Sequence, residues 1–206
     1  MNRVDEAARE ALAGRLIVLP TDTVYGMGTR PDDPQATGRL FEAKRRPRDL
    51  TLPVLVASED DASSVGVMDG RARALARRFW PGPLTLVIPR AERSREWDLG
   101  GDTGTVGLRR PRHLLALAVL ERAGPLAVTS ANVSGAPTPA TCDGLVELFG
   151  AAVSVYLCQD EPLGGPSSTV VDLAHGRPAI LREGAVAAGD VLGFLREPDR
   201  DLPAGP

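Results

Sequence analysis

The stretch LIVLPTDTVYGMG, residues 16–28, contains the two features on which the interpretation of this chain rests. The apolar run Leu16–Leu19 predicts a short buried strand, and Pro20 ends it because proline lacks a backbone donor. Three hydroxyl groups and a carboxylate follow directly, and ligand sites in open α/β sheets gather where strands end. We therefore expect residues 20–28 to be a loop at a binding site. The alternative is a turn in which these side chains only satisfy backbone groups.

The rest of the chain alternates in the same way between helical and extended patterns. Apolar residues at helical spacing predict helices at Arg3–Ala13, Pro34–Lys44, Ala72–Phe79, His113–Ala123, Cys142–Phe149 and Gly189–Phe194. Short apolar runs predict strands at Leu16–Leu19, Leu52–Val56, Leu84–Ile88, Thr105–Leu108, Leu126–Thr129, Val153–Leu157, Ser168–Asp172 and Ala179–Arg182. Because the two kinds do not repeat as regular βαβ units, a mixed sheet with helices packed on it is favoured. We expect one α/β domain over residues 1–197 and a disordered tail over residues 198–206.

Composition and charge exclude several classes of protein. At 43% hydrophobic and 25% charged residues over 206 positions, the chain can bury a globular core. A net charge of −3 argues against a protein that coats nucleic acid by bulk attraction. No apolar run approaches the length of a membrane span, and the N-terminus lacks a signal-peptide pattern. We therefore expect a soluble, cytoplasmic protein without a membrane contact.

Several sequence signatures of enzymes are missing. The chain has no Gly-x-x-x-x-Gly-Lys-Ser/Thr phosphate loop and no Gly-x-Gly-x-x-Gly segment after a strand. The two histidines, His113 and His175, have no serine or cysteine nearby that reads as a nucleophile. We expect surface or capping roles for them, which argues against a Ser-His-Asp or Cys-His hydrolase. Cys142 and Cys158 lack metal-ligand spacing, so we expect two reduced thiols and no protein-built metal site.

Basic side chains gather at the end of the second predicted helix. The segment KRRPRD, residues 44–49, stands where cations also interact favourably with the helix dipole, which is the structural explanation. In the functional interpretation, Lys44 and Arg46 point into the concave face of the sheet and bind phosphates. Arginine offers a planar fork of donors and lysine a mobile point charge, and phosphoryl chemistry commonly uses both.

Polar side chains also follow later strands. The segment VTSANVSGAPT, residues 128–138, supplies neutral donors that suit a polyphosphate, and GGPSST, residues 164–169, is a second group of hydroxyls. Arg109 and Arg182 each end a predicted strand, where they suit a carboxylate or a phosphate. Together these segments predict one polar site that binds a phosphate-rich ligand and a small zwitterion.

Six segments resemble the YrdC family of threonylcarbamoyl-AMP synthases in order and spacing. They are PTDTVYG (residues 20–26), KRRP (44–47), FWPGPLT (79–85), SANVSG (130–135), STVVD (168–172) and ILREG (180–184). The match extends from about Gly14 to Val186, and Lys-x-Arg together with Ser-x-Asn is its most specific mark. The resemblance implies a twisted, mixed sheet with helices packed on it and an open, basic concave face.

The resemblance also implies an activity. The enzyme would be a nucleotidyltransferase that condenses L-threonine, bicarbonate or CO₂, and ATP into threonylcarbamoyl-AMP and pyrophosphate. A partner transferase complex would then move the threonylcarbamoyl group to an adenosine beside the anticodon of tRNA. Mg²⁺ would arrive with the ATP. The sequence leaves open whether the protein contacts tRNA directly. Asp22 is expected to cap backbone groups, with an approach to that metal as the alternative.

The residues that match the family motifs divide into two groups. Those implied on the nucleotide side are Lys44, Arg46, Thr105, Ser130, Asn132, Thr138 and Arg182, with Lys44 and Arg46 as the catalytic pair. Those implied on the threonine side are Thr23, Arg109, the backbone at Val128, and Ser168.

The sequence departs from the family pattern at one position, and two other functions are compatible with it. Many long family members have a histidine where this chain has Leu55; short bacterial members lack it, so we interpret Leu55 as a mark of subtype. The first rival function is a non-catalytic RNA- or nucleotide-binding protein with the same fold. The second is an ATP-dependent ligase for another amino acid, because one methyl group contributes only about 1–3 kcal/mol of discrimination.

Overall fold

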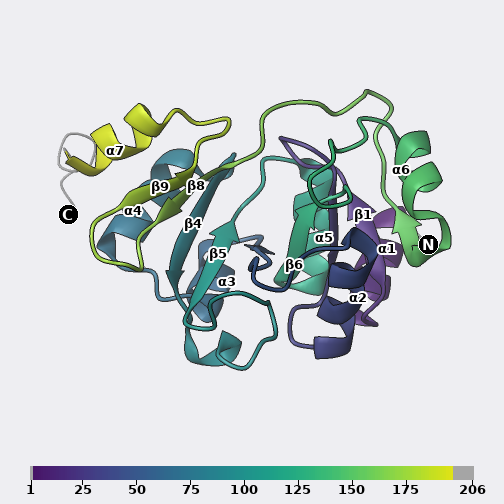
Figure 1. The fold of residues 1–206 in the computed structure, drawn as a ribbon, viewed down its shortest axis with the longest axis horizontal. Coiled ribbons are helices and arrows are strands. Elements are labelled where there is room, and N and C mark those ends of the chain that lie inside the picture. The colour runs from purple at the N-terminus through teal and green to yellow at the C-terminus, as the bar shows by residue number, and fades with distance from the viewer. Residues whose placement is uncertain (1, 197–206) are drawn as a thin grey trace.

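One twisted, mixed sheet organises residues 2–196, the part of the chain that the computed structural model describes (Figure 1). Its nine strands stand in the order β7-β1-β2-β6-β3-β5-β4-β8-β9. The pairs β1–β7, β3–β5 and β4–β8 are parallel and the other five are antiparallel, as the sequence predicts for a mixed sheet. The strands are β1 (Leu16–Leu19), β2 (Gly26–Thr29), β3 (Val54–Leu55), β4 (Leu84–Pro89), β5 (Thr105–Arg109), β6 (Leu126–Ser130), β7 (Val153–Tyr156), β8 (Thr169–Asp172) and β9 (Ala179–Arg182).

Seven α-helices in the described residues pack on this sheet. They are α1 (Arg3–Leu12), α2 (Pro34–Lys44), α3 (Glu59–Val65), α4 (Gly70–Phe79), α5 (Leu114–Ala123), α6 (Cys142–Phe149) and α7 (Ala188–Arg196). Five of them begin at a side chain that accepts a backbone N–H, which satisfies a donor that the first turn leaves free. These caps are Asn2, Asp33, Ser58, Asp69 and Thr141. Within residues 2–196, no helix has the length and apolar character needed to cross a membrane.

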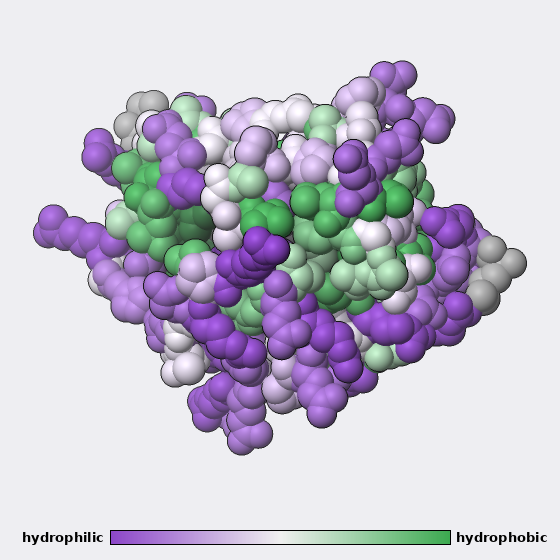
Figure 2. All heavy atoms as spheres, turned by 45° about the vertical axis from the view of Figure 1, so that its right-hand side comes forward, coloured by the Kyte–Doolittle hydropathy of each residue, from purple (hydrophilic) through white to green (hydrophobic). Residues whose placement is uncertain are grey.

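The two faces of the sheet are covered unequally. Helices α1 and α5 pack together over one face, against Ile17 and Leu19 of β1. The core on the opposite face includes residues of α2, α4 and α6. Leu55 and Val128 belong to the core under α1 and α5 and also line the cavity described below. The cavity therefore begins where the cover by these two helices ends. The surface in Figure 2 mixes hydrophobic groups across its middle with projecting hydrophilic ones.

Strand β2 corrects our expectation of a loop over residues 20–28. The sequence Gly-Met-Gly-Thr lacks the β-branched residues that usually indicate a strand. Its glycines are required by the neighbouring strand, because a Cβ at Gly26 or Gly28 would stand 2.6 Å from a methyl carbon of Val128. Tertiary packing of β2 between β1 and β6 therefore decides this strand, and only residues 20–25 form the loop.

Most other elements agree with the prediction to within two residues at each end, but two regions differ from it, a strand that is shorter and a helix that is additional. The expected strand Leu52–Val56 has only Val54 and Leu55 in regular pairing, since Pro53 cannot donate and the amide of Leu52 bonds to Leu99 instead. Helix α3 was not predicted. Its start signal is present, because Ser58 caps it and three acidic residues fill its first turn, but the helix is short and carries few apolar residues.

The two cysteines correct the expectation of reduced thiols. Cys142 and Cys158 form a disulfide, with Cα atoms 5.8 Å apart. The sequence alone hides this pairing, because it depends on the start of α6 lying beside the end of β7. The chain then crosses the molecule toward β8, along the upper edge of Figure 1. The predicted disordered tail, residues 198–206, lies outside the described residues.

Candidate active site

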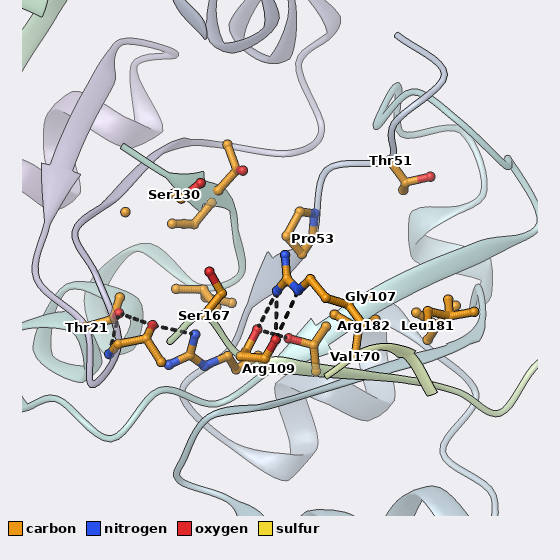
Figure 3. A pocket seen from close by; sticks show the side chains of 18 of the residues that line it. Thr21, Thr51, Pro53, Gly107, Arg109, Ser130, Ser167, Val170, Leu181 and Arg182 are labelled. Carbon is orange, nitrogen blue, oxygen red and sulfur yellow. Dashed lines mark hydrogen bonds between the residues drawn. The ribbon is translucent and has the colours of Figure 1, made fainter. Parts of the chain in front are cut away.

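A cavity of about 490 Å³ opens on the part of the sheet that α1 and α5 leave uncovered. Segments distant in sequence line it: the loop after β1, the segment after α2, strands β4 and β5, the end of β6, and β8 with β9. Figure 3 shows Arg109 extending toward Thr21 and Arg182 extending toward Pro53. The cavity is therefore assembled from strand ends, as the positions of the polar segments predict.

Arg109, at the end of β5, is 7% exposed and held on three sides. Its Nε donates to the carbonyl of Gly82 at 3.1 Å, Nη1 to Thr23 Oγ1 at 3.1 Å, and Nη2 to Asp22 Oδ1 at 2.6 Å. Burial lowers the pKa of Arg109, and the Asp22 carboxylate opposes that effect. Since a guanidinium has five N–H donors, two remain for a ligand, and a bidentate pair of donors matches a carboxylate.

The hydroxyl of Thr23 is oriented by its neighbours. Thr21 Oγ1 donates its one proton to the carbonyl of Val24 at 2.6 Å, and it lies 3.0 Å from Thr23 Oγ1. Thr23 must then donate to Thr21 while it accepts from Arg109. The loop after β1 and the end of β5 thus form one connected hydrogen-bond network. Asp22 belongs to it as well, because its Oδ1 also accepts the backbone N–H of Arg112 at 2.8 Å.

Arg182, at the end of β9, binds the beginning of β8. Its Nη2 donates to the carbonyl of Ser168 at 2.8 Å and lies 3.2 Å from Ser168 Oγ. Ser168 Oγ is 2.9 Å from Thr85 Oγ1 on β4, so three strands meet at this serine. Burial lowers the pKa of Arg182. Arg182 is an exposed residue that lines the cavity.

Lys44 and Arg46 diverge, although we expected both to point into the concave face. The residue between them, Arg45, has a left-handed backbone with φ of 49°, which ends α2 and turns the chain. Arg46 lines the cavity and donates to the carbonyls of Leu50 and Thr51 at 3.2 and 3.0 Å. Lys44 is 1% exposed and lies behind the cavity wall.

The ammonium of Lys44 holds the loop that follows β6. Its Nζ donates to the carbonyl of Ser130, to the carbonyl of Asn132 at 2.6 Å and to Asn132 Oδ1 at 3.2 Å. Burial, with a smaller contribution from Arg46, lowers the pKa of Lys44 to about 8. Because three oxygen acceptors favour the charged form, we expect an ammonium at neutral pH.

Comparison with known proteins identifies the chain. A family model described as telomere recombination, Sua5_yciO_yrdC, matches residues 10–184. The chain belongs to the Sua5/YciO/YrdC family. A Mycobacterium leprae protein is 46% identical over 186 residues, which cover 88% of this chain and 84% of that protein. The Pyrococcus abyssi threonylcarbamoyl-AMP synthase is 38% identical over 89% of this chain and 54% of its own length.

Solved structures agree with this assignment. P. abyssi Sua5 complexed with L-threonine superimposes with a TM-score of 0.83 at 35% identity, over 94% of this chain and 58% of that chain. E. coli YciO gives a TM-score of 0.80 at 25% identity, over 89% of this chain and 90% of that chain. The resemblance to the YrdC family and the expected mixed α/β fold are therefore confirmed.

In this Sua5/YciO/YrdC chain the cavity brings together most of the residues that the family motifs imply. Those that line it are Thr23, Arg46, Thr105, Arg109, Val128, Ser130, Ser168 and Arg182. Lys44, Asn132 and Thr138 do not line it. Asn132 is engaged on both sides of its amide: Oδ1 accepts from Lys44 and from Ser130 Oγ, and Nδ2 donates to the carbonyls of Val133 and Ala136. Direct contact of these three residues with ATP stays a prediction.

The Sua5/YciO/YrdC cavity also contains residues that sequence reasoning missed. Thr85, 5% exposed on the otherwise apolar β4, orients Ser168, and a lone hydroxyl in such a strand is the signal that could have found it. At the cavity edge, His175 Nδ1 lies 3.0 Å from Asp172 Oδ2, and Asp102 accepts from Thr105 Oγ1 at 2.9 Å. The 62% exposure of the His175 side chain agrees with the predicted surface position. Only the fold brings residues 102 and 175 together.

Gly184 packs against the backbone of Ser167 and Ser168, so a substitution at Gly184 tests whether their positions matter for the site. A Cβ at Gly184 would stand 2.0 Å from the carbonyl oxygen of Ser167 and 2.7 Å from the carbonyl carbon of Ser168. We expect Gly184→Ala to displace both serines, to lower the unfolding free energy by about 1–3 kcal/mol, and to weaken threonine binding. Denaturant unfolding and threonine titration measure both effects. Gly193→Ala in α7 is the control, because its Cβ would meet nothing within 4 Å; equal behaviour of the two variants would contradict the assignment.

Proposed function

We propose that this chain is a threonylcarbamoyl-AMP synthase that makes threonylcarbamoyl-AMP and pyrophosphate from L-threonine, bicarbonate or CO₂, and ATP. The observation that carries this conclusion is a single cavity, in a Sua5/YciO/YrdC chain, with a buried guanidinium at one end and two further arginines beside it. A relative from P. abyssi is named for this activity, and a Sua5 structure is described as complexed with L-threonine. Threonine is the small zwitterion that such a cavity suits.

Each substrate has a matching set of groups. The threonine carboxylate takes the two free N–H donors of Arg109, beside Thr23 and Ser168. The ATP phosphates take Arg46 and Arg182, which line the cavity together with Ser130. Burial lowers the pKa of Arg46, and the like charge of Arg182 lowers it further. A polyanion placed between them relieves that repulsion.

The reaction needs no covalent enzyme intermediate. The unprotonated threonine amine adds to CO₂ and releases a proton to solvent, or adds to bicarbonate with loss of water, and forms a carbamate. A carbamate oxygen then attacks the α-phosphorus of ATP, and pyrophosphate leaves with the electrons of the broken P–O bond. Positioning and charge neutralisation by the arginines supply the acceleration, as in other phosphoryl and nucleotidyl transfers.

Mg²⁺ enters this proposal together with ATP. Three carboxylates near the cavity have partners: Asp22 Oδ1 accepts from Arg109, Asp102 from Thr105 and the amide of Gly104, and Asp172 from the turn after β8. Asp22 Oδ2 is buried without a hydrogen-bond partner, and Asp49 also lines the cavity. Such a set fits an ion that the nucleotide phosphates hold, with water as the remaining ligand. Its chemistry is to neutralise the phosphate charge. Asp22 Oδ1 has the structural role that we expected, because it accepts from Arg109 and from the backbone N–H of Arg112.

The wider setting is part of the same proposal. The product supplies a transferase complex that modifies the adenosine beside the tRNA anticodon, and the enzyme works in the cytoplasm, where its substrates meet. The non-catalytic RNA-binding alternative is not favoured, because relatives over most of the chain are named as synthases.

The assay for this function is direct. The protein is incubated with ATP, bicarbonate and one amino acid at a time, and pyrophosphate release is measured. We expect release that depends on both threonine and bicarbonate, and a kcat/KM for serine lower by about 10- to 200-fold, the range that one methyl group supports. A ligase for another amino acid would show a different preference. RNA binding without any pyrophosphate release would support the binding-protein alternative and overturn the proposal.

A further inference from the structure

The disulfide joins the two segments that lead into the cavity. Cys142 is the first residue of α6 and directly follows the hydroxyl loop, which we define as residues 130–141. Cys158 lies near the start of the strap, defined as residues 157–168, which crosses the molecule to β8 (Figure 1). The hydroxyl loop begins at Ser130 and the strap ends at Ser168, and both serines line the cavity.

The strap and the hydroxyl loop also bond to one another and to the site. The amide of Leu163 in the strap donates to the carbonyl of Ala140 in the hydroxyl loop at 2.8 Å. The backbone N–H of Gln159, next to Cys158, donates to the hydroxyl of Tyr25 at 3.2 Å. Tyr25 lines the cavity. The first part of the loop is fixed separately, by Lys44. The disulfide is thus the covalent anchor of the loop's other end.

Both cysteine residues are accessible in part. Cys142 and Cys158 each fall between buried and exposed, and Cys158 packs against the core. Cys142 lies at the N-terminus of α6, where the helix dipole stabilises a thiolate and makes this sulfur the better leaving group. The chain has two cysteines in all, so no third thiol competes within the molecule.

We propose that Cys142 and Cys158 are a reversible redox pair whose closure orders the hydroxyl loop for ATP binding. In opening, a thiolate of a small dithiol attacks Cys158 Sγ, the S–S bond breaks and Cys142 leaves as a thiolate. The second thiol of the reductant then attacks its own mixed disulfide and releases Cys158. The reductant becomes a cyclic disulfide, having given two electrons to the protein. Closure is the reverse exchange with a small disulfide.

The two halves of the cavity respond differently to this step. Opening frees the end of the hydroxyl loop, which follows Ser130 and Asn132, so the nucleotide side loses order. Arg109 is held by Gly82, Thr23 and Asp22, none of which belongs to the loop or the strap. Ser168, at the far end of the strap from Cys158, is held by Thr85 and Arg182. We therefore expect reduction to raise the KM for ATP by about 5- to 20-fold, the lower part of the usual range of coupling between sites. The KM for threonine should change by less than about twofold on the same scale.

The test compares oxidised and reduced forms of the full chain. Thiol labelling with mass spectrometry first establishes the closed and the open pair, before and after treatment with dithiothreitol. Both KM values are then measured for wild type and for Cys142→Ser, Cys158→Ser and the double variant. Reduced wild type and the double variant should share the raised KM for ATP, and dithiothreitol should leave the double variant unchanged. Hydrogen exchange in residues 130–141 should accelerate on opening.

Two results would overturn the redox proposal. One is a protein whose thiols stay free after incubation with oxidised glutathione, and the other is an equal KM for ATP and equal hydrogen exchange in both forms. The proposal rests on the synthase function for its kinetic readout only. If no form releases threonine-dependent pyrophosphate, the proposed function fails, while ATP titration calorimetry and hydrogen exchange still decide whether the cysteine pair controls the loop.

Discussion

Arg109→Lys is expected to raise the KM for threonine by about 100-fold, since two charge-assisted hydrogen bonds at about 1.5–3 kcal/mol each are at stake. Lysine keeps the charge, but it cannot reach the carbonyl of Gly82, Thr23 Oγ1 and Asp22 together and still present two donors to a carboxylate. The KM for ATP should change little, because Arg46 and Arg182 are untouched. Steady-state pyrophosphate release with each substrate varied measures the two constants separately.

A matched substitution isolates this effect. Arg112→Lys makes the same chemical change three residues later, in an exposed side chain that does not line the cavity, and it keeps the backbone N–H that Asp22 accepts. We expect near-normal constants for that variant. Arg109→Ala adds a stability readout, because it leaves the largely buried carboxylate of Asp22 without its cationic partner, at a cost of about 3–5 kcal/mol in unfolding free energy. A normal KM for threonine in folded Arg109→Lys would show that the carboxylate binds elsewhere.

Lys44→Met is expected to lower the rate of pyrophosphate release by about 100-fold or more through the loop rather than through lost phosphate contact. The substitution leaves the carbonyl oxygens of Ser130 and Asn132 and the Asn132 Oδ1 without their shared donor, and each unsatisfied buried group costs about 1–3 kcal/mol. Ser130 would then leave its place on the cavity wall. Circular dichroism and denaturant unfolding establish that the variant is folded, and hydrogen exchange in residues 130–141 reports the loop itself.

The neighbouring residue provides the control for Lys44. Arg45→Met removes a basic side chain one position away, which is exposed and does not line the cavity. Arg46→Met removes a cation from the cavity wall without touching the loop's donors. We expect Arg45→Met to behave as wild type and Arg46→Met to weaken ATP binding with normal hydrogen exchange. Near-normal turnover of Lys44→Met would refute both the loop-holding role and the predicted catalytic role of this lysine.

The sequence could predict much of the fold because many elements carry local signals. Helices α2 and α6 were predicted with their observed bounds, since their apolar spacing and their end signals agree. Strand β2 could not be predicted, because glycines packed against Val128 take the place of apolar alternation. The disulfide could not be predicted either, because the cysteines are 16 positions apart in the sequence. Only the path of the chain from α6 through β7 brings them together.

What the sequence determined by itself is the family, the mixed α/β class and the identity of the strand-end residues, because motifs and apolar periods are written locally in the chain. Only the tertiary structure decided which side chains share the cavity. A left-handed residue at Arg45 sends Arg46 to the cavity and Lys44 behind it, and no local pattern separates two cations two positions apart. The loop within LIVLPTDTVYGMG binds a guanidinium, because β5 places Arg109 beside Asp22 and Thr23. Such contacts span more than 80 residues of sequence, and the packing of strands fixes them.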